Sequence, residues 1–217
     1  MTPYETAISQ ITTRPTLIYG LKFLPSLEPH VSDNRDEPAW GWPYGPEVSD
    51  GNLEVVRSVV ERMGDKCRAI LEIGVHRNEG RSMTNILMDR RPAGSVYVGV
   101  DIDDKSYLDD HSKKNFTIKS NSHDQKKIRS FLESIGVKEI DILMIDGWHS
   151  VNTCINDWCY TDMLSQHGCV ILHDTNAHPG CISLFHSVDE NLFEKTRFHT
   201  EMHDMGISTF WHKAKTS

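Results

Sequence analysis

The sequence lacks several features that mark membrane, secreted and nucleic-acid-binding proteins. None of its apolar runs approaches the length of a membrane-spanning helix. The opening residues, MTPYETAISQ, lack the basic and apolar regions of a signal peptide. The formal net charge is −8, whereas an electrostatic nucleic-acid binder shows a basic patch. We therefore expect neither a membrane nor a nucleic acid as partner.

Cysteine is also scarce, and its pattern is informative. The five cysteines are odd in number, and their spacing fits neither a disulfide framework nor paired zinc-binding CxxC motifs. This usage favours a reducing, cytoplasmic location. Apolar residues make up 38% and charged residues 25% of the 217 positions, which is ordinary for a soluble globular domain.

Strand and helix patterns alternate along most of the chain. This alternation predicts an α/β fold with a doubly wound, mostly parallel sheet and helices on both faces. We expect strands at residues 69–73, 95–100, 116–119, 139–145 and 169–172. We expect helices at residues 6–11, 49–63, 82–91, 124–135, 151–165 and 182–191. Two last strands, at residues 196–202 and 207–212, predict a C-terminal antiparallel hairpin.

The N-terminal residues are the least regular part of the sequence. Residues 1–49 are expected to form an arm or lid, and residues 50–217 to form the single domain. The segment at 38–46, PAWGWPYGP, is rich in proline, glycine and aromatic residues. Either its tryptophans pack the arm on the domain or the segment covers a substrate pocket, and the two readings are compatible.

The stretch at residues 69–82, AILEIGVHRNEGRS, organises the rest of the chain. A buried strand leads to Gly74, and a loop containing Gly80 leads to a helix. Such a loop lets the backbone approach a small ligand, and the helix start offers free N–H groups. The acidic Glu72 suits a ligand with cationic character. Alternatively, Gly74 only turns the chain out of the sheet, and the stretch taken alone favours this simpler reading.

Polar residues at the ends of the following strands favour a ligand site. In a parallel sheet, ligands bind outside the carboxyl ends of the strands. An acidic residue closing the second strand, here Asp101, usually accepts hydrogen bonds from ribose hydroxyls. A helix cap could explain any one of these residues, but not all of them together. The strand ends carry Glu72, Gly74, Asp101, Ser120, Asn121, Ser122, Asp146, His149, His173 and Asp174.

A nicotinamide dinucleotide is a less suitable ligand. Its G-x-G-x-x-G fingerprint requires a second glycine where the backbone meets the pyrophosphate. This chain has Glu79 near that place. We therefore expect a nucleoside without a pyrophosphate.

The combined motifs resemble the class I S-adenosylmethionine-dependent methyltransferases. The resemblance lies in Glu72-Ile-Gly74-Val-x4-Gly80-Arg-Ser82, in Asp101, and in Ile145-Asp146-Gly-x-His149. The branch most similar to this chain is the cephalosporin-hydroxylase-like and sugar or macrolide O-methyltransferases. The resemblance covers residues 50–212 and implies a Rossmann-like fold.

The resemblance also implies which residues bind S-adenosylmethionine. Glu72 and Gly74 would contact its methionine part, and Gly80 and Ser82 would complete the loop around it. Asp101 would hold the ribose hydroxyls. Asn121 and Ser122 would lie near the adenine.

A second resemblance, to metal-dependent O-methyltransferases, implies a divalent cation held by Asp146, His173 and Asp174. Carboxylates suit Mg²⁺, whereas a histidine ligand favours a softer ion such as Mn²⁺. His173 departs from those families, which carry a carboxylate at that position. The alternative is that Asp146 holds the cofactor's amino group and His173 is structural.

His149 is the candidate catalytic base, with Asp146 as its catalytic neighbour. Methyl transfer to a hydroxyl requires a base or a metal that lowers the hydroxyl pKa. A histidine has an unperturbed pKa of about 6.5, which suits this task, although His149 could instead cap the next helix. We expect four other histidines at the surface or in packing, namely His76, His178, His199 and His203. Of these, His178 follows the fifth strand closely enough to reach the pocket.

The sequence thus predicts an S-adenosylmethionine-dependent methyltransferase, acting on a hydroxyl of a small molecule or sugar. The alternative is an inactive methyltransferase-like module that binds a nucleoside, although such a binder has no need of Asp146 and His149. The acceptor stays open, as does assembly into a homo-oligomer.

Overall fold

The fold is built on a main sheet of seven strands between two helical layers. The computed structural model describes residues 3–29, 48–76, 82–198 and 204–213. The strand order is β5-β4-β3-β6-β7-β9-β8. Neighbours from β5 to β7 are parallel, whereas β9 runs antiparallel to β7 and β8. The strands are β3 (Ala69–Ile73), β4 (Val96–Asp101), β5 (Asn115–Lys119), β6 (Ile140–Ile145), β7 (Leu164–His173), β8 (Phe193–Phe198) and β9 (Ile207–His212). The predicted mostly parallel sheet and C-terminal hairpin are confirmed.

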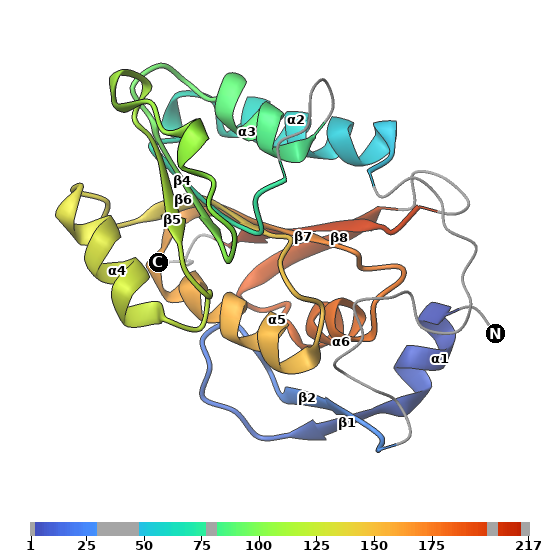
Figure 1. Cartoon of the computed structure of the whole chain (residues 1–217). Helices are drawn as coiled ribbons and strands as arrows, with labels where there is room; N and C mark the ends of the chain where they lie inside the picture. The colour runs from blue at the N-terminus through green and yellow to red at the C-terminus, as the bar shows by residue number, and fades with distance from the viewer. Residues whose placement is uncertain (1–2, 30–47, 77–81, 199–203, 214–217) are drawn as a thin grey trace.

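Helices cover both faces of the sheet (Figure 1). The helices α2 and α3 pack on one face, and α4, α5 and α6 pack on the other. The central strands β3 and β6 are buried along their whole length, because side chains on both faces meet helices. None of the described helices combines the length and apolar character needed to cross a membrane. The helices are α2 (Asp50–Met63), α3 (Met83–Asp89), α4 (Gln125–Ser134), α5 (Val151–Trp158) and α6 (Pro179–Ser187).

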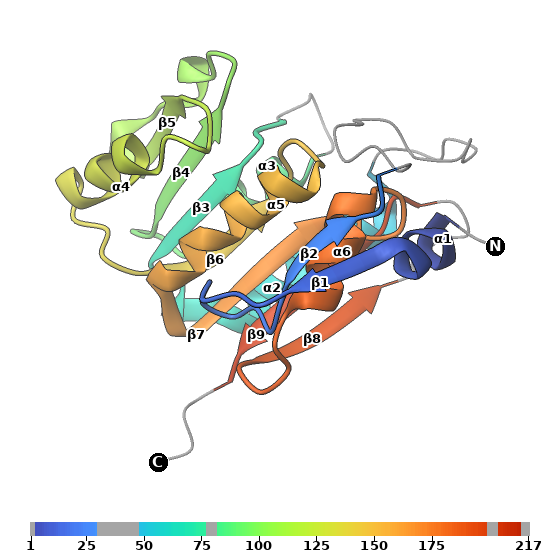
Figure 2. The same cartoon turned by 90° about the horizontal axis from the view of Figure 1, so that it is seen from below.

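The described part of the N-terminal segment packs on the outer side of α5 and α6 (Figure 2). It contains α1 (Pro3–Gln10) and a two-stranded antiparallel sheet of β1 (Ile11–Arg14) and β2 (Leu24–Leu27). The indole N–H of Trp158 donates to the Tyr19 carbonyl at 2.9 Å. These two short strands were not predicted from the sequence. The PAWGWPYGP segment lies outside the described residues, so its role as a lid stays a prediction.

Several predicted boundaries are wrong. The helix predicted at 151–165 ends at Trp158, continues as a 3₁₀ turn, Cys159–Met163, and gives way to β7 at Leu164. Leu164 pairs with Ile140, and the Ser165 hydroxyl donates to Asp141 Oδ1 at 2.7 Å. The apolar pattern of the helix continues to Leu164, so only the pairing with β6 shows where the helix gives way to the strand.

Two later boundaries shift as well. The helix α6 starts earlier than predicted, because Pro179 stands at its first turn, where a missing N–H has no cost. Strand β8 also starts earlier than the predicted 196–202. Residues 199–203 lie outside the described residues.

Gly74 allows the ends of β3 and β6 to approach closely. Its φ of +83° is a conformation that glycine adopts readily. A Cβ at this position would lie 2.0 Å from the backbone oxygen of Asp146. The Gly74 N–H donates to the Val100 carbonyl at 2.9 Å, and the Asp146 N–H donates to the Ile73 carbonyl at 2.8 Å. Gly74 therefore has a structural role beyond turning the chain.

We predict that Gly74→Ala lowers the free energy of unfolding more than Gly94→Ala does. Gly94 also has a positive φ, +87°, but among the described residues no atom lies within 4 Å of the place that its Cβ would take. Both variants carry backbone strain of about 1–3 kcal/mol. Only Gly74→Ala adds a collision with backbone. Each kcal/mol shifts Tm by about 2–4 °C in a chain of this size, so thermal melts will separate the two. Equal shifts would contradict the packing argument.

Candidate functional site

A cavity of about 660 Å³ opens at the carboxyl edge of the sheet. Its size lies within the roughly 300–1,000 Å³ that is usual for ligand pockets. It lies at the point where the strand order reverses, because β4 is added on one side of β3 and β6 on the other. Its walls include Gly74, Asp101, Asn121, Ser122, Asp146, Trp148, His149, His173, Asp174 and His178. Most of the predicted site residues are therefore brought together.

Asp101 ends β4 with its carboxylate held by backbone N–H groups. Val75 donates to Oδ2 and Asp103 donates to Oδ1, each at 2.8 Å. A carboxylate has about four lone-pair directions, so these two hydrogen bonds do not use all of them. The Lys105 ammonium also lies 3.8 Å from Oδ2. The carboxylate is oriented before any ligand arrives, which lowers the entropic cost of binding.

The loop after β5 contributes Asn121 and Ser122 to the same wall. The Asn121 Oδ1 accepts the His123 N–H at 2.9 Å, and the Ser122 carbonyl accepts the Tyr160 hydroxyl at 2.8 Å. These bonds fix the loop beside the end of β4. Asp101, Asn121 and Ser122 thus form one side of the cavity.

Glu72 is not among the residues lining this cavity. It is buried, and its carboxyl group accepts hydrogen bonds from the Thr84 hydroxyl at 2.8 Å and from the Tyr97 hydroxyl. Burial raises the pKa of Glu72 to about 8, although these two hydrogen bonds oppose the shift. At pH 7 the group is largely protonated, so it does not offer a full negative charge. Its contact with a ligand stays a prediction.

The remaining predicted cofactor residues are not seen at the cavity. Ser82 caps α3, where its Oγ accepts the Asn85 N–H at 3.1 Å, and it lines a separate groove between α2 and α3. Gly80 lies outside the described residues. Their roles also stay predictions.

The opposite side of the cavity holds a cluster of histidines and aspartates. The Nε2 of His149 lies 2.7 Å from Asp174 Oδ2. The Nδ1 of His173 lies 3.0 Å from Asp146 Oδ1 and 3.1 Å from the same Asp174 Oδ2. One oxygen of Asp174 therefore contacts two histidines. Asp174 has a φ of +61°, an uncommon conformation that aspartate tolerates and that often marks a functional site.

The protonation of His173 follows from its neighbours. The Asn52 side-chain nitrogen lies 3.1 Å from His173 Nε2. Because an amide nitrogen only donates, Nε2 accepts and the ring proton sits on Nδ1, facing both carboxylates. Burial alone would lower the pKa of His173, but Asp174 and Asp146 outweigh it and raise the pKa to about 10. Near pH 7 this pKa places a second proton on Nε2, and the Asn52 amide then turns its oxygen to the ring. In either form Nδ1 carries a proton that faces both carboxylates.

Asp174 is held in its ionised form. Burial opposes ionisation, but His173 and His149 outweigh it and hold the pKa of the carboxyl well below its usual range. The cluster can therefore orient imidazole rings, accept a proton at a histidine and hold a cation.

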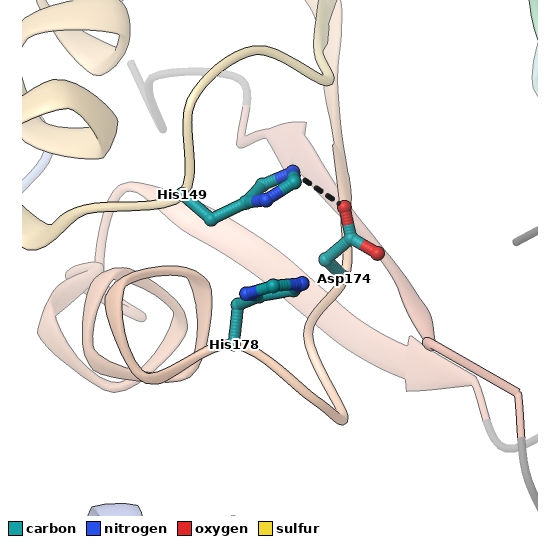
Figure 3. Close-up of side chains that lie close together, drawn as sticks. All are labelled: His149, Asp174 and His178. Carbon is teal, nitrogen blue, oxygen red and sulfur yellow. Dashed lines mark ion pairs between the residues drawn. The ribbon is translucent and has the colours of Figure 1, made fainter. Parts of the chain in front are cut away.

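His178 belongs to this cluster. The sequence predicts it to be a surface or packing residue, but one close enough to the fifth strand to reach the pocket. It is buried, and its ring stacks on that of His149 with 4.1 Å between centroids (Figure 3). The available signal was its position four residues after Asp174, just before the first turn of α6. Sequence alone cannot show which way a loop histidine points.

Solved structures with the same fold include several methyltransferases. No protein-family model matches the sequence, and a search of curated sequences finds no relative. MycE methyltransferase from the mycinamycin biosynthetic pathway, solved with Mg and SAH, matches with a TM-score of 0.57 and 13% identity. The match covers 79% of this chain and 52% of MycE, so the chain spans about half the length of that relative.

Two further structures agree. An O-methyltransferase from Bacillus cereus in complex with SAH has a TM-score of 0.55 and 15% identity, covering 78% of this chain and 84% of its own. CalS11, a TDP-rhamnose 3′-O-methyltransferase of calicheamicin biosynthesis, has a TM-score of 0.55 and 10% identity. The match covers 74% of this chain and 79% of CalS11. The chain has the Rossmann-like fold of these methyltransferases. At such identities the likeness concerns the fold, and function must be argued from the cavity.

We predict that Glu72→Gln changes the pH dependence of stability. The unfolded pKa is about 4.5 and the folded pKa about 8. Between these values the native state keeps a proton that the unfolded state releases, so stability falls as pH rises. The slope is about 1.4 kcal/mol per pH unit. Glutamine removes it, so the Tm of the variant relative to wild type will rise from pH 5 to pH 8.

The control is Glu61→Gln, which changes an exposed glutamate on α2. Surface substitutions usually alter stability by less than about 0.5 kcal/mol, so the difference from wild type should stay small throughout. If the difference in Tm between Glu72→Gln and wild type does not vary with pH, Glu72 is ionised in the native state.

Proposed function

We propose that the protein is an S-adenosylmethionine-dependent methyltransferase acting on a hydroxyl of a small molecule or sugar. The observation that carries this proposal is the cavity, which has Asp101 on one side and the cluster of His149 and Asp174 on the other. The fold supports it, since MycE and the Bacillus cereus enzyme were solved with SAH and CalS11 is a sugar O-methyltransferase by name.

The nucleoside half of the ligand fits the first side of the cavity. The Asp101 carboxylate, oriented by two backbone N–H groups, suits a pair of ribose hydroxyls. Asn121 and Ser122 are the adjoining wall and would lie beside the base. Gly74 lines the cavity where the two halves meet. Contacts from Glu72, Gly80 and Ser82 to the methionine half remain part of the proposal.

The acceptor hydroxyl would lie beside His149. When bound, S-adenosylmethionine supplies a methyl group on a positively charged sulfur, which is reactive toward an oxygen nucleophile. Asp174 holds Nε2 of His149, so Nδ1 is the nitrogen that would take the hydroxyl proton. The carboxylate fixes the ring and stabilises the imidazolium that forms, as in other His–Asp pairs. Asp146 acts on this arrangement through His173.

The predicted metal set of Asp146, His173 and Asp174 fits a cation poorly in this arrangement. Its three donor atoms lie within 4.8 Å of one another. However, the Nδ1 of His173 carries a proton that faces both carboxylates, so it presents a donor rather than a lone pair. Binding an ion there would require that proton to leave. No step of the proposed reaction passes through this set.

Binding of SAH tests the cofactor half of the proposal. We expect Asp101→Asn to weaken SAH binding by about 10–100-fold, because a hydrogen bond to a charged group contributes about 1.5–3 kcal/mol. Isothermal titration calorimetry measures the affinity, and a thermal melt checks that the variant is folded. Asp104→Asn is the control, since Asp104 is exposed and does not line the cavity. Unchanged SAH affinity in Asp101→Asn, or none in wild type, would overturn the cofactor assignment.

Turnover tests the catalytic half. With chelator present, methyl-labelled S-adenosylmethionine and a panel of sugars, phenols and polyketide-like alcohols, wild type should yield labelled product. His149→Ala should lower the rate by about 10²–10⁴-fold, the usual contribution of a general base. SAH affinity should not change, and activity should recover partly at high pH. The exposed His167→Ala is the control. Binding without product from any acceptor would favour the nucleoside-binding module instead.

A further inference from the structure

A second set of potential metal ligands shares Asp174 with the cluster described above. The side chains of His149, Asp174 and His178 each offer one donor atom, and the three atoms lie within 4.8 Å of one another. Figure 3 shows both imidazole rings reaching toward the Asp174 carboxylate from the same side. They come from three places, namely the loop after β6, the end of β7 and the residue before α6. Asp174 and His178 share one turn of the chain, and tertiary packing brings His149 to them.

The spacing of these atoms suits a single ion. Zinc binds nitrogen at about 2.0–2.1 Å and carboxylate oxygen at about 2.0–2.2 Å, so two ligands of one tetrahedral ion lie roughly 3.3 Å apart. The Nε2 of His149 and Oδ2 of Asp174 are 2.7 Å apart. If these two atoms moved apart by less than about 1 Å, an ion could bind between them. The ring centroids are 4.1 Å apart, and one nitrogen of each ring lies within 4.8 Å of the other donor atoms.

The surroundings hold the three residues in position. Asp174 and His178 are buried, at 4% and 1% exposure. A Cβ on Gly180 would lie 2.0 Å from the backbone oxygen of His149, which shows how tightly the start of α6 packs against the His149 loop. The site is therefore built from rigid parts, as metal sites require.

The donor chemistry distinguishes this set from its neighbour. His173 presents a proton to Asp146 and Asp174, as its contact with Asn52 dictates. The neutral ring of His149 can carry its single proton on Nδ1 instead, which leaves a lone pair on Nε2 for an ion. Two histidines and one carboxylate favour borderline divalent transition ions over Mg²⁺, and leave coordination positions open. All three residues line the cavity, so an open position would face a ligand there.

We propose that His149, Asp174 and His178 bind a divalent first-row transition ion through two imidazole nitrogens and one carboxylate oxygen. The inference goes beyond the proposed methyl transfer, because binding requires only these side chains. With the ion bound to Nε2 and the ring proton on Nδ1, His149 is a ligand and not a base. The ion would then lower the pKa of a hydroxyl that coordinates at its open position.

The test begins with full-length protein freed of metal by chelation. Zn²⁺ binding is measured by calorimetry and Co²⁺ binding by visible absorption, with excess Mg²⁺ present. We expect one equivalent to bind and Mg²⁺ not to displace it. His178→Ala should weaken binding by more than about 100-fold, since even loss of a residue that only supports a ligand costs about 10–100-fold. His178→Gln, which keeps more of the side-chain volume, should show the same loss.

Two controls separate this set from its neighbours. His123→Ala removes a histidine that lines the same cavity from the loop after β5, and should leave Zn²⁺ affinity unchanged. Asp146→Asn disrupts the other candidate set and should change the affinity less than about tenfold, a smaller effect than loss of a true ligand. If Asp146→Asn abolishes binding while His178→Ala preserves it, the ion belongs to Asp146, His173 and Asp174, and the proposal is overturned.

A measurement on wild type guards against variants that fail to fold. X-ray absorption of the Zn²⁺-loaded protein should report two imidazole ligands at about 2.0 Å. One imidazole or none would overturn the proposal. SAH binding is measured on the same samples, with and without metal. No metal binding alongside intact SAH binding overturns only the metal site, whereas metal binding without SAH binding overturns only the proposed cofactor.

Discussion

The close approach of Gly74 to Asp146 is the constraint on which the cavity depends. Strands β3 and β6 are the centre of the sheet, and their ends meet with no space for a Cβ. One side of the cavity contains Asp101, at the end of β4 beside β3. The other contains His149, in the loop after β6. Because β3 and β6 also pair along residues 70–73 of β3, the two halves are held at one fixed separation. A fixed separation is what transfer between two bound molecules needs.

The acidic residues of the site differ in what burial does to them. Glu72 is enclosed by Tyr97 and Thr84, and burial raises its pKa to about 8. Asp101 stands at the wall, where two backbone N–H groups donate to its carboxylate. The first is therefore a neutral, hydrogen-bonded core group near pH 7, whereas the second is a carboxylate on the cavity wall. Neighbouring strands thus place the same functional group in the core in one case and at the cavity in the other.

Asp174 organises the opposite side through a single oxygen. Its Oδ2 contacts His149 and His173, and its positive φ directs the carboxylate between them. The two histidines then differ, because Asn52 fixes the proton of His173 while His149 stacks on His178. His173 thus contacts both Asp146 and Asp174, and His149 is the histidine to which we assign the role of base.

The sequence by itself determined the class of fold and the edge of the sheet at which the site lies. Alternating buried strands and amphipathic helices dictate a parallel sheet, and parallel strands carry their ends to one edge. Asp101, Asp146, His149 and Asp174 follow directly from that rule. Tertiary structure alone decided three things: that Glu72 turns into the core, that His178 joins the cluster, and that Leu164 leaves the helix to pair with Ile140. In each case, the direction of a side chain or the partner of a strand depends on residues far away in the sequence, which no local pattern encodes.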